Sequence, residues 1–139
     1  MFSIQLTAKI ENMEVLVQSV SSIAGKMGFT AKRIREIELA VEEALVNIIN
    51  YAYPCGVGDI KITCIQEDSP RAFVIEIEDT GVAFDLLSLK DPDISADLSE
   101  RQIGGLGIFL IRKLMNDVQY RRKNNRNVLT LVAYPPNET

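Results

Sequence analysis

The sequence contains no histidine. This absence excludes a histidine general base, a catalytic triad that includes histidine, the usual zinc ligands and phosphohistidine chemistry. Any proton transfer must therefore use a carboxylate, a lysine or a tyrosine. Cysteine is scarce as well. Cys55 and Cys64 stand outside any CxxC pattern, which favours reduced thiols over a disulfide framework.

Long apolar runs and an excess of positive charge are also missing. The apolar run Ile108–Ile111 is far shorter than a membrane span, which needs about 20 residues. The N-terminus has no basic leader followed by a long apolar segment, so we expect a cytoplasmic protein without a membrane partner. The chain has 15 Lys and Arg against 19 Asp and Glu, and this net charge of −4 disfavours direct binding of nucleic acid.

Hydrophobic patterning predicts a single α+β domain over residues 1–139. With 139 residues, of which 47% are hydrophobic, the chain can bury a core without disulfides or structural metals. Apolar alternation predicts strands, and 3.6-residue spacing predicts helices. The expected order is a strand over 2–10, a helix from Met13 after an Asn12 cap to Gly28, a helix from a Thr30 cap to about Tyr53, strands over 59–66 and 72–78, a helix over 108–115, and strands over 117–122 and 127–133. This order favours a two-layer sandwich with helices packed on one face of a mostly antiparallel, mixed sheet.

Four groups of polar or glycine residues are candidates for a functional site. They are Glu43 with Asn47 on one face of the second helix, Asp79 at the end of a strand, Arg101 late in the irregular segment 80–103, and Gly104, Gly105 and Gly107 at the start of a helix. Each has a plainer interpretation, namely a solvated helix face, turn chemistry or a flexible connector. The basic residues Arg121, Arg122, Lys123 and Arg126 are interpreted as a solvated hairpin end.

Together these groups match the separate needs of a nucleoside triphosphate. Glycines that open a helix offer backbone N–H groups and the positive end of the helix dipole to phosphate oxygens. The amide oxygen of Asn47 can be sufficient protein ligation for Mg²⁺, which keeps waters and phosphates in its shell. The carboxylate of Asp79 can accept a hydrogen bond from the exocyclic amine of adenine. Glu43, one turn before Asn47, can accept the proton of a nucleophile.

The segments ELAVEEALVNIINYAYP, DTGVAFD and RQIGGLGIFLIRKLMNDVQYRR resemble the N, G1 and G2 boxes of the anti-sigma-factor serine kinases. That family is part of the histidine-kinase-like ATPase superfamily, which also includes the gyrase and chaperone ATPases. The resemblance covers about residues 3 to 133 and implies a Bergerat-type ATP-binding fold.

The resemblance implies a role for each matching residue. Glu43 would be the catalytic base, Arg101 would contact the terminal phosphate, and Asn47 would be the Mg²⁺ ligand. Asp79 would accept a hydrogen bond from the adenine amine, Gly81 would allow close approach of the base, and Thr130 would lie near adenine. Gly105 and Gly107 would line the phosphate site beside Gly104. The chain departs from the family pattern at Tyr51, where His is frequent, at Leu86, where Pro is common, and at Asn116, where Asp is frequent.

The resemblance predicts an ATP- and Mg²⁺-dependent serine/threonine protein kinase that acts as an anti-sigma regulatory factor. Its substrate would be a STAS-domain anti-anti-sigma protein, with a sigma factor as the competing ligand and nucleotide state deciding between them. The alternative is an ATP-binding module that sequesters a partner protein without phosphoryl transfer, and a free-standing ATP hydrolase is a third hypothesis. Relatives commonly dimerise, so a homodimer through the first strand and helix is the oligomer to test.

Overall fold

The computed structural model describes residues 1–54, 56–83 and 105–136. Within these residues the elements are β1 (Phe2–Thr7), the short 3₁₀ turn η1 (Ile10–Asn12), α1 (Met13–Lys26), α2 (Ala31–Tyr51), β2 (Asp59–Asp68), β3 (Arg71–Asp79), α3 (Gly105–Leu114), β4 (Asp117–Lys123) and β5 (Arg126–Ala133). In this described part of the chain, no helix is long and apolar enough to cross a membrane.

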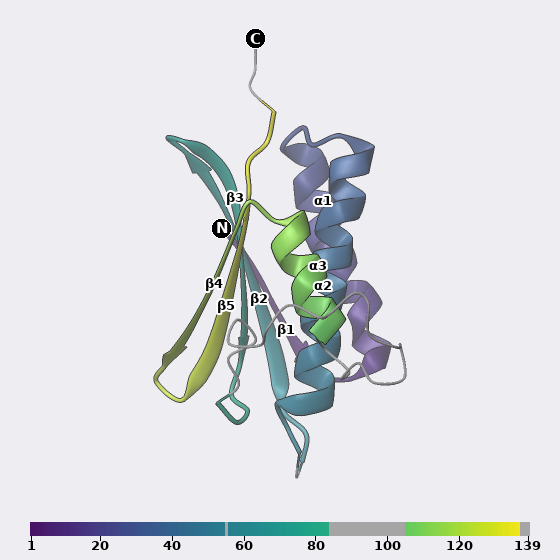
Figure 1. Cartoon of the computed structure of the whole chain (residues 1–139), viewed down its shortest axis with the longest axis vertical. Coiled ribbons are helices and arrows are strands. Elements are labelled where there is room, and N and C mark those ends of the chain that lie inside the picture. The colour runs from purple at the N-terminus through teal and green to yellow at the C-terminus, as the bar shows by residue number, and fades with distance from the viewer. Residues whose placement is uncertain (55, 84–104, 137–139) are drawn as a thin grey trace.

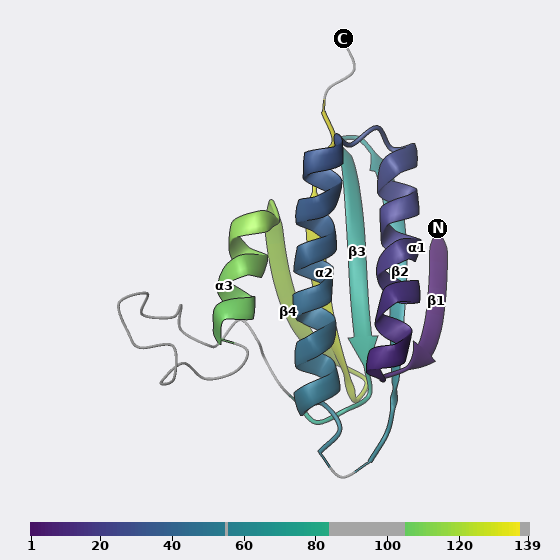
Figure 2. The same ribbon diagram turned by 90° about the vertical axis from the view of Figure 1, so that its right-hand side faces the viewer.

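The five strands form one sheet in the order β1-β2-β3-β5-β4, and every pair of neighbours is antiparallel. Figure 1 shows the three helices on one side of this sheet, and Figure 2 shows α1 over the β1–β2 side with α3 over the β4 side. The predicted α+β architecture with helices on one face is therefore confirmed. The closing hairpin places β5, its second strand, beside β3 and leaves β4 at the edge.

The core lies between the helices and the inward face of the sheet. Side chains alternate along a strand, so Phe73, Ile75 and Ile77 of β3 all face the helices, and all three are fully buried. The apolar stripe of α2 packs against them, with its Ile37, Val41 and Leu45 at 0% exposure and its Ile34 partly buried. Cys64 is a free thiol in this core, where burial raises its pKa to about 11. Cys55 lies outside the described residues.

A glycine cap ends α1 and a threonine side-chain cap begins α2, as the sequence predicts. Gly28 adopts a φ of +88° after α1, and the next backbone N–H, that of Phe29, donates to the carbonyl of Ala24 in a Schellman arrangement. Thr30 then caps α2, because its side-chain oxygen accepts from the backbone N–H of Arg33 at 3.1 Å.

The start of α1 differs from the prediction. The Asn12 side chain makes no capping hydrogen bond, and its Nδ2 donates to the carbonyl of Thr7 at 2.8 Å. The cause is the 3₁₀ turn over Ile10–Asn12, which already holds Asn12 in a helical conformation. The same turn ends β1 at Thr7, so Ile10 does not continue the strand and is 66% exposed.

The hairpin between β4 and β5 turns at Asn124 and Asn125, whose φ values are +52° and +62°. Two-residue hairpin loops favour positive φ at both positions, and asparagine tolerates this conformation. The third helix begins at Gly105, three residues before the predicted Ile108.

The end of β3 is joined to the end of α2 by a close backbone contact. A Cβ atom added to Gly81 would lie 2.1 Å from the carbonyl oxygen of Ala52, the residue that follows α2. The same oxygen accepts a hydrogen bond from the backbone N–H of Val82 at 2.9 Å. Only glycine allows this approach, which brings the last turns of α2 next to the carboxyl end of β3.

We expect Gly81→Ala to lower the free energy of unfolding by about 1–3 kcal/mol, because the new methyl group must push the chain away from the α2 carbonyl. Chemical denaturation measures this change. Gly56→Ala is the matched control, since a Cβ atom at Gly56 meets no heavy atom within 4 Å. Equal stability of the two variants would contradict the packing argument.

Candidate functional site

Asp79 is a buried carboxylate at the end of β3. It is 4% exposed and follows Phe73, Ile75 and Ile77 on the inward face. Its Oδ1 accepts from the backbone N–H of Gly81 at 2.9 Å and from Nδ2 of Asn127 at 2.8 Å. Desolvation raises the pKa of Asp79, although these two hydrogen bonds and the charge of Arg122 act in the opposite direction. No described residue donates a hydrogen bond to Oδ2, so this oxygen can accept one from a ligand.

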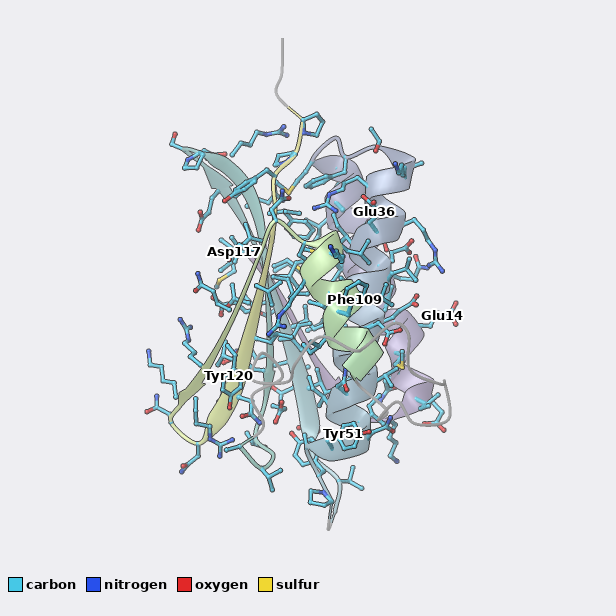
Figure 3. All side chains as sticks on the ribbon, viewed as in Figure 1. Glu14, Glu36, Tyr51, Phe109, Asp117 and Tyr120 are labelled. Carbon is cyan, nitrogen blue, oxygen red and sulfur yellow. The ribbon has the colours of Figure 1, made fainter. Side chains whose placement is uncertain are left out.

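A small cavity of about 20 Å³ lies beside the Asp79 carboxylate. It is lined by Ile48, Ala52, Ile77, Asp79, Tyr120, Asn127 and Leu129. This volume holds about one water molecule. In Figure 3, Tyr51 at the end of α2 and Tyr120 on β4 both lie towards the end of the molecule where β3 terminates. The cavity is too small for a base, but its apolar wall and the Asp79 carboxylate are groups that the amine-bearing edge of an aromatic base can contact.

Asn47 carries a buried hydrogen-bond acceptor that no residue described by the structure satisfies. The side chain is 1% exposed, and its Nδ2 donates to the carbonyl of Glu43 at 2.8 Å. Its Oδ1 has no hydrogen-bond partner among the described residues. A buried polar atom left unsatisfied costs about 1–3 kcal/mol. An amide oxygen is a ligand that Mg²⁺ accepts, so the Oδ1 of Asn47 fits a Mg²⁺ ion that also binds phosphates beside α2.

Glu43 lies one helical turn before Asn47, on the same face of α2. Its side chain is partly buried. Burial raises the pKa of Glu43, and the neighbouring charge of Glu42 raises it further. A carboxylate whose pKa moves towards neutrality is better suited to accept a proton at physiological pH.

The amino end of α3 is the third part of the candidate site. The helix begins at Gly105, so Gly105 and Gly107 lie in its first turn, where backbone N–H groups have no partner within the helix. Figures 1 and 2 show α3 running beside α2 in the opposite direction, with its amino end towards the carboxyl-terminal half of α2. Arg101 and Gly104 lie outside the described residues.

The structure adds a contact at Gly81 and places Thr130 away from Asp79. The Ala52 carbonyl gives the glycine at 81 a packing role, and the approach of a base there stays a prediction. Thr130 pairs with Glu76 and alternates with the inward residues Leu129 and Leu131, so it lies on the sheet face away from the helices. The structure therefore does not bring Thr130 to Asp79.

Asn127 is the residue of β5 that lies beside Asp79, and the sequence analysis missed it. The two residues are direct partners in the antiparallel register of β3 and β5. A strand that ends at Asp79 must pair with the beginning of an antiparallel neighbour, so the register was the signal that could have identified Asn127. Arg122 is exposed, as expected for a solvated hairpin end, and it also donates to Asn127 Oδ1 at 3.2 Å and to the carbonyl of Gly81 at 2.8 Å.

The departures from the family pattern have separate consequences. Tyr51 ends α2 and is partly buried. The Oδ1 of Asn116 accepts from Arg33 at 2.9 Å and from the backbone N–H of Tyr134 at 3.0 Å, so it joins the start of α2 to the end of β5. Leu86 lies outside the described residues.

The comparison with protein families identifies the family of the chain. The model of the histidine kinase-like ATPase domain matches residues 6–133. The chain belongs to this family. A serine-protein kinase RsbW from Bacillus cereus is 33% identical over 130 residues, which are 90% of this chain and 79% of that protein. The RsbW of Listeria monocytogenes is 36% identical over 124 residues, 84% of this chain and 76% of that protein. Membership among the anti-sigma-factor serine kinases is thereby confirmed.

Solved structures agree on the fold of this ATPase family. The RsbU and RsbW domains of Rv1364c from Mycobacterium tuberculosis match with a TM-score of 0.65 at 13% identity, over 97% of this chain and 33% of that one. The histidine kinase domain of a blue-light activated histidine kinase from Erythrobacter litoralis matches with a TM-score of 0.54 at 14% identity, over 88% of this chain and 59% of that one.

The raised pKa of Asp79 predicts a gain of stability on removal of its charge. The folded protein holds the protonated carboxyl group of Asp79 more easily than the ionised one. The stability that this group contributes is therefore complete below its pKa of about 3.9 in the unfolded chain, and it is lost as the pH rises through the higher pKa in the folded protein. Asp79→Asn avoids this loss and keeps an oxygen for the Gly81 and Asn127 donors. We therefore expect the variant to unfold at higher denaturant concentration than wild type at neutral pH, with no advantage below about pH 4.

Denaturation midpoints between acid and neutral pH measure this effect. The exposed carboxylate of Asp68 supplies the control variant Asp68→Asn, for which we expect no comparable gain. An Asp79→Asn protein less stable than wild type at neutral pH would show that the charge is not the cause.

Proposed function

We propose that this chain is an ATP- and Mg²⁺-dependent serine/threonine protein kinase that acts as an anti-sigma regulatory factor. Its family is one of protein-serine kinases, and its relatives carry the name serine-protein kinase RsbW. The observation that supports catalysis most directly is the buried Oδ1 of Asn47, which has no hydrogen-bond partner among the described residues. It lies one turn from Glu43, a carboxylate whose pKa burial raises. The proposed metal ligand and the proposed base thus lie on one helix face.

Each part of the site has a distinct task in the proposed reaction. Asp79 would accept the adenine amine through Oδ2, Asn47 would hold Mg²⁺ through Oδ1, and the first turn of α3 would offer N–H groups to the phosphates. When bound, Mg²⁺ neutralises phosphate charge. Arg101 stays the predicted partner of the terminal phosphate.

Glu43 would act on the protein substrate. The ionised carboxylate of Glu43 takes the proton of a serine or threonine hydroxyl on the partner. A bond forms between that oxygen and the γ-phosphorus, the bond between this phosphorus and the β,γ-bridging oxygen breaks, and ADP leaves with the bridging electrons. The proton ends on Glu43, so the base must be deprotonated at the start of each cycle.

The resemblance supports a STAS-domain anti-anti-sigma protein as the substrate and a sigma factor as the competing ligand. Incubation with labelled ATP and a candidate STAS protein tests this directly. We expect a label that alkali releases and hydroxylamine does not, as for a phosphate ester of serine. Replacement of the acceptor serine in the partner by alanine is the control. ATP binding without any transfer to such partners would favour the alternative module that only sequesters a partner.

We expect Glu43→Gln to keep Mg·ATP binding and to lower the rate of transfer by about 10²–10⁴-fold, because a general base contributes this much. Single-turnover transfer measures the rate, and calorimetry measures binding. The wild-type rate should rise with pH as Glu43 loses its proton, with an apparent pKa above the ordinary 4.5 of a glutamate. Glu36→Gln is the matched control, because Glu36 lies near the start of α2 and pairs with Arg33. Transfer at the wild-type rate by Glu43→Gln would reject the base.

We expect Asn47→Leu to leave the stability of the ligand-free protein nearly unchanged and to weaken Mg·ATP binding by about tenfold or more. An apolar side chain of similar shape removes an orphaned acceptor at little cost, whereas the metal loses its protein ligand. Unfolding curves with and without Mg·ATP report both effects. The control is Asn50→Leu, at an exposed position one turn on. Wild-type affinity in Asn47→Leu would remove the metal ligand from the proposal.

A further inference from the structure

Asn127 forms the centre of a hydrogen-bond network beneath the Asp79 carboxylate. The side chain is 5% exposed. Its Nδ2 donates to Asp79 Oδ1 at 2.8 Å and to the carbonyl of Val82 at 2.7 Å. Its Oδ1 accepts from the hydroxyl of Tyr120 at 2.6 Å and from Nη1 of Arg122 at 3.2 Å. One amide therefore joins β4, the end of β3 and the chain that follows β3.

Arg122 determines which way this amide points. A guanidinium can only donate, so it must face the oxygen of Asn127 and not the nitrogen. Arg122 is held independently, because it also donates to the carbonyl of Gly81 at 2.8 Å. The Nδ2 of Asn127 must then face Asp79 and occupy its Oδ1. This chain of contacts leaves Oδ2 as the oxygen available to a ligand.

The same network favours the ionised form of Asp79. Burial raises the pKa of Asp79, while the hydrogen bond from Asn127 is the largest of the effects that lower it. Arg122 is the cation that faces the pair from β4. Glu78, Asp59, Lys61 and Arg126 line a shallow pocket with Asp79 at this end of the sheet, and the α2 residues in the small cavity, Ile48 and Ala52, carry no charge.

We propose that Asn127 is a positioning residue for base recognition: it holds the Asp79 carboxylate with Oδ2 free for the exocyclic amine of adenine and couples that carboxylate to the backbone at Val82. The inference rests on the proposed function, because it assumes a purine nucleotide at Asp79. An ionised, oriented carboxylate accepts from the amine of ATP and repels the keto oxygen of GTP. Preference for ATP over GTP therefore depends on a residue that does not itself contact the base.

The variant Asn127→Asp tests this with the smallest change of shape. An aspartate keeps an oxygen for Tyr120 and Arg122 but loses the donor to Asp79, and two facing carboxylates share one proton. The shared proton restores a donor at low pH and is lost as the pH rises. We expect the ratio of the variant's Kd for Mg·ATP to that of wild type to increase by about tenfold or more from pH 6 to pH 8. Calorimetry with Mg·ATP and with Mg·GTP at each pH measures this ratio and the preference between the nucleotides.

Two further variants supply a control for the change of charge and a second test of the same hydrogen-bond network. Asn125→Asp makes the same change of charge in the turn of the same hairpin, where φ is +62°, and its Kd ratio should stay near one at every pH. Tyr120→Phe preserves the size of the ring and removes the hydroxyl that holds Asn127. We expect it to weaken ATP binding by about fivefold and to lower the preference for ATP, even if Asn127→Asp proves too unstable to measure.

Failure of the inference and failure of the proposed function give different results. Wild-type protein that binds no Mg·ATP would overturn the proposed function and this inference with it. Wild-type protein that binds Mg·ATP, together with Asn127→Asp and Tyr120→Phe variants whose affinity, pH profile and nucleotide preference match wild type, would overturn the inference alone. A pH-dependent loss in Asn127→Asp that Asn125→Asp does not share would support it.

Discussion

The contact between Gly81 and the carbonyl of Ala52 is the constraint on which the site depends. It holds the end of β3 against the end of α2, and the Val82 N–H closes the junction with a hydrogen bond to the same carbonyl. Without this approach, the carboxylate of Asp79 in the sheet and the polar face of α2 in the helical layer would lie farther apart. Fold and site therefore share one close backbone contact, in which any side chain at position 81 would displace one of the layers.

Two buried polar groups in the site work against the stability of the ligand-free protein. Asn47 hides an acceptor that no described residue satisfies, and the carboxylate of Asp79 is removed from water at a cost that its hydrogen bonds only partly offset. Apolar residues in these places would fold more easily. Groups of this kind are expected where a ligand completes the missing interactions, because ligand binding then recovers the free energy that burial of these polar groups costs.

The helical layer and the sheet carry different parts of the proposed site. The face of α2 carries the groups proposed to act on the metal and the proton, while the sheet carries the groups proposed to recognise the base. Arg122 and Asn127 belong to the sheet, and they act on Asp79 through hydrogen bonds that run along the edge of the cavity. Recognition of the base and the chemistry at the phosphate therefore rest on different elements, which meet at the junction of Gly81 and Ala52.

The sequence by itself determined the local structure and part of the site. Periodicity located the helices and strands, the four-residue spacing placed Glu43 and Asn47 on one face, and strand alternation turned Asp79 inward. Tertiary structure alone decided that Asn127 and not Thr130 lies beside Asp79, that Arg122 turns towards the site, and that the Asn47 oxygen has no partner among the described residues. The reason is physical: periods of 3.6 and 2 residues are set by the local backbone, whereas strand register and the partners of buried polar atoms depend on segments far apart in the chain.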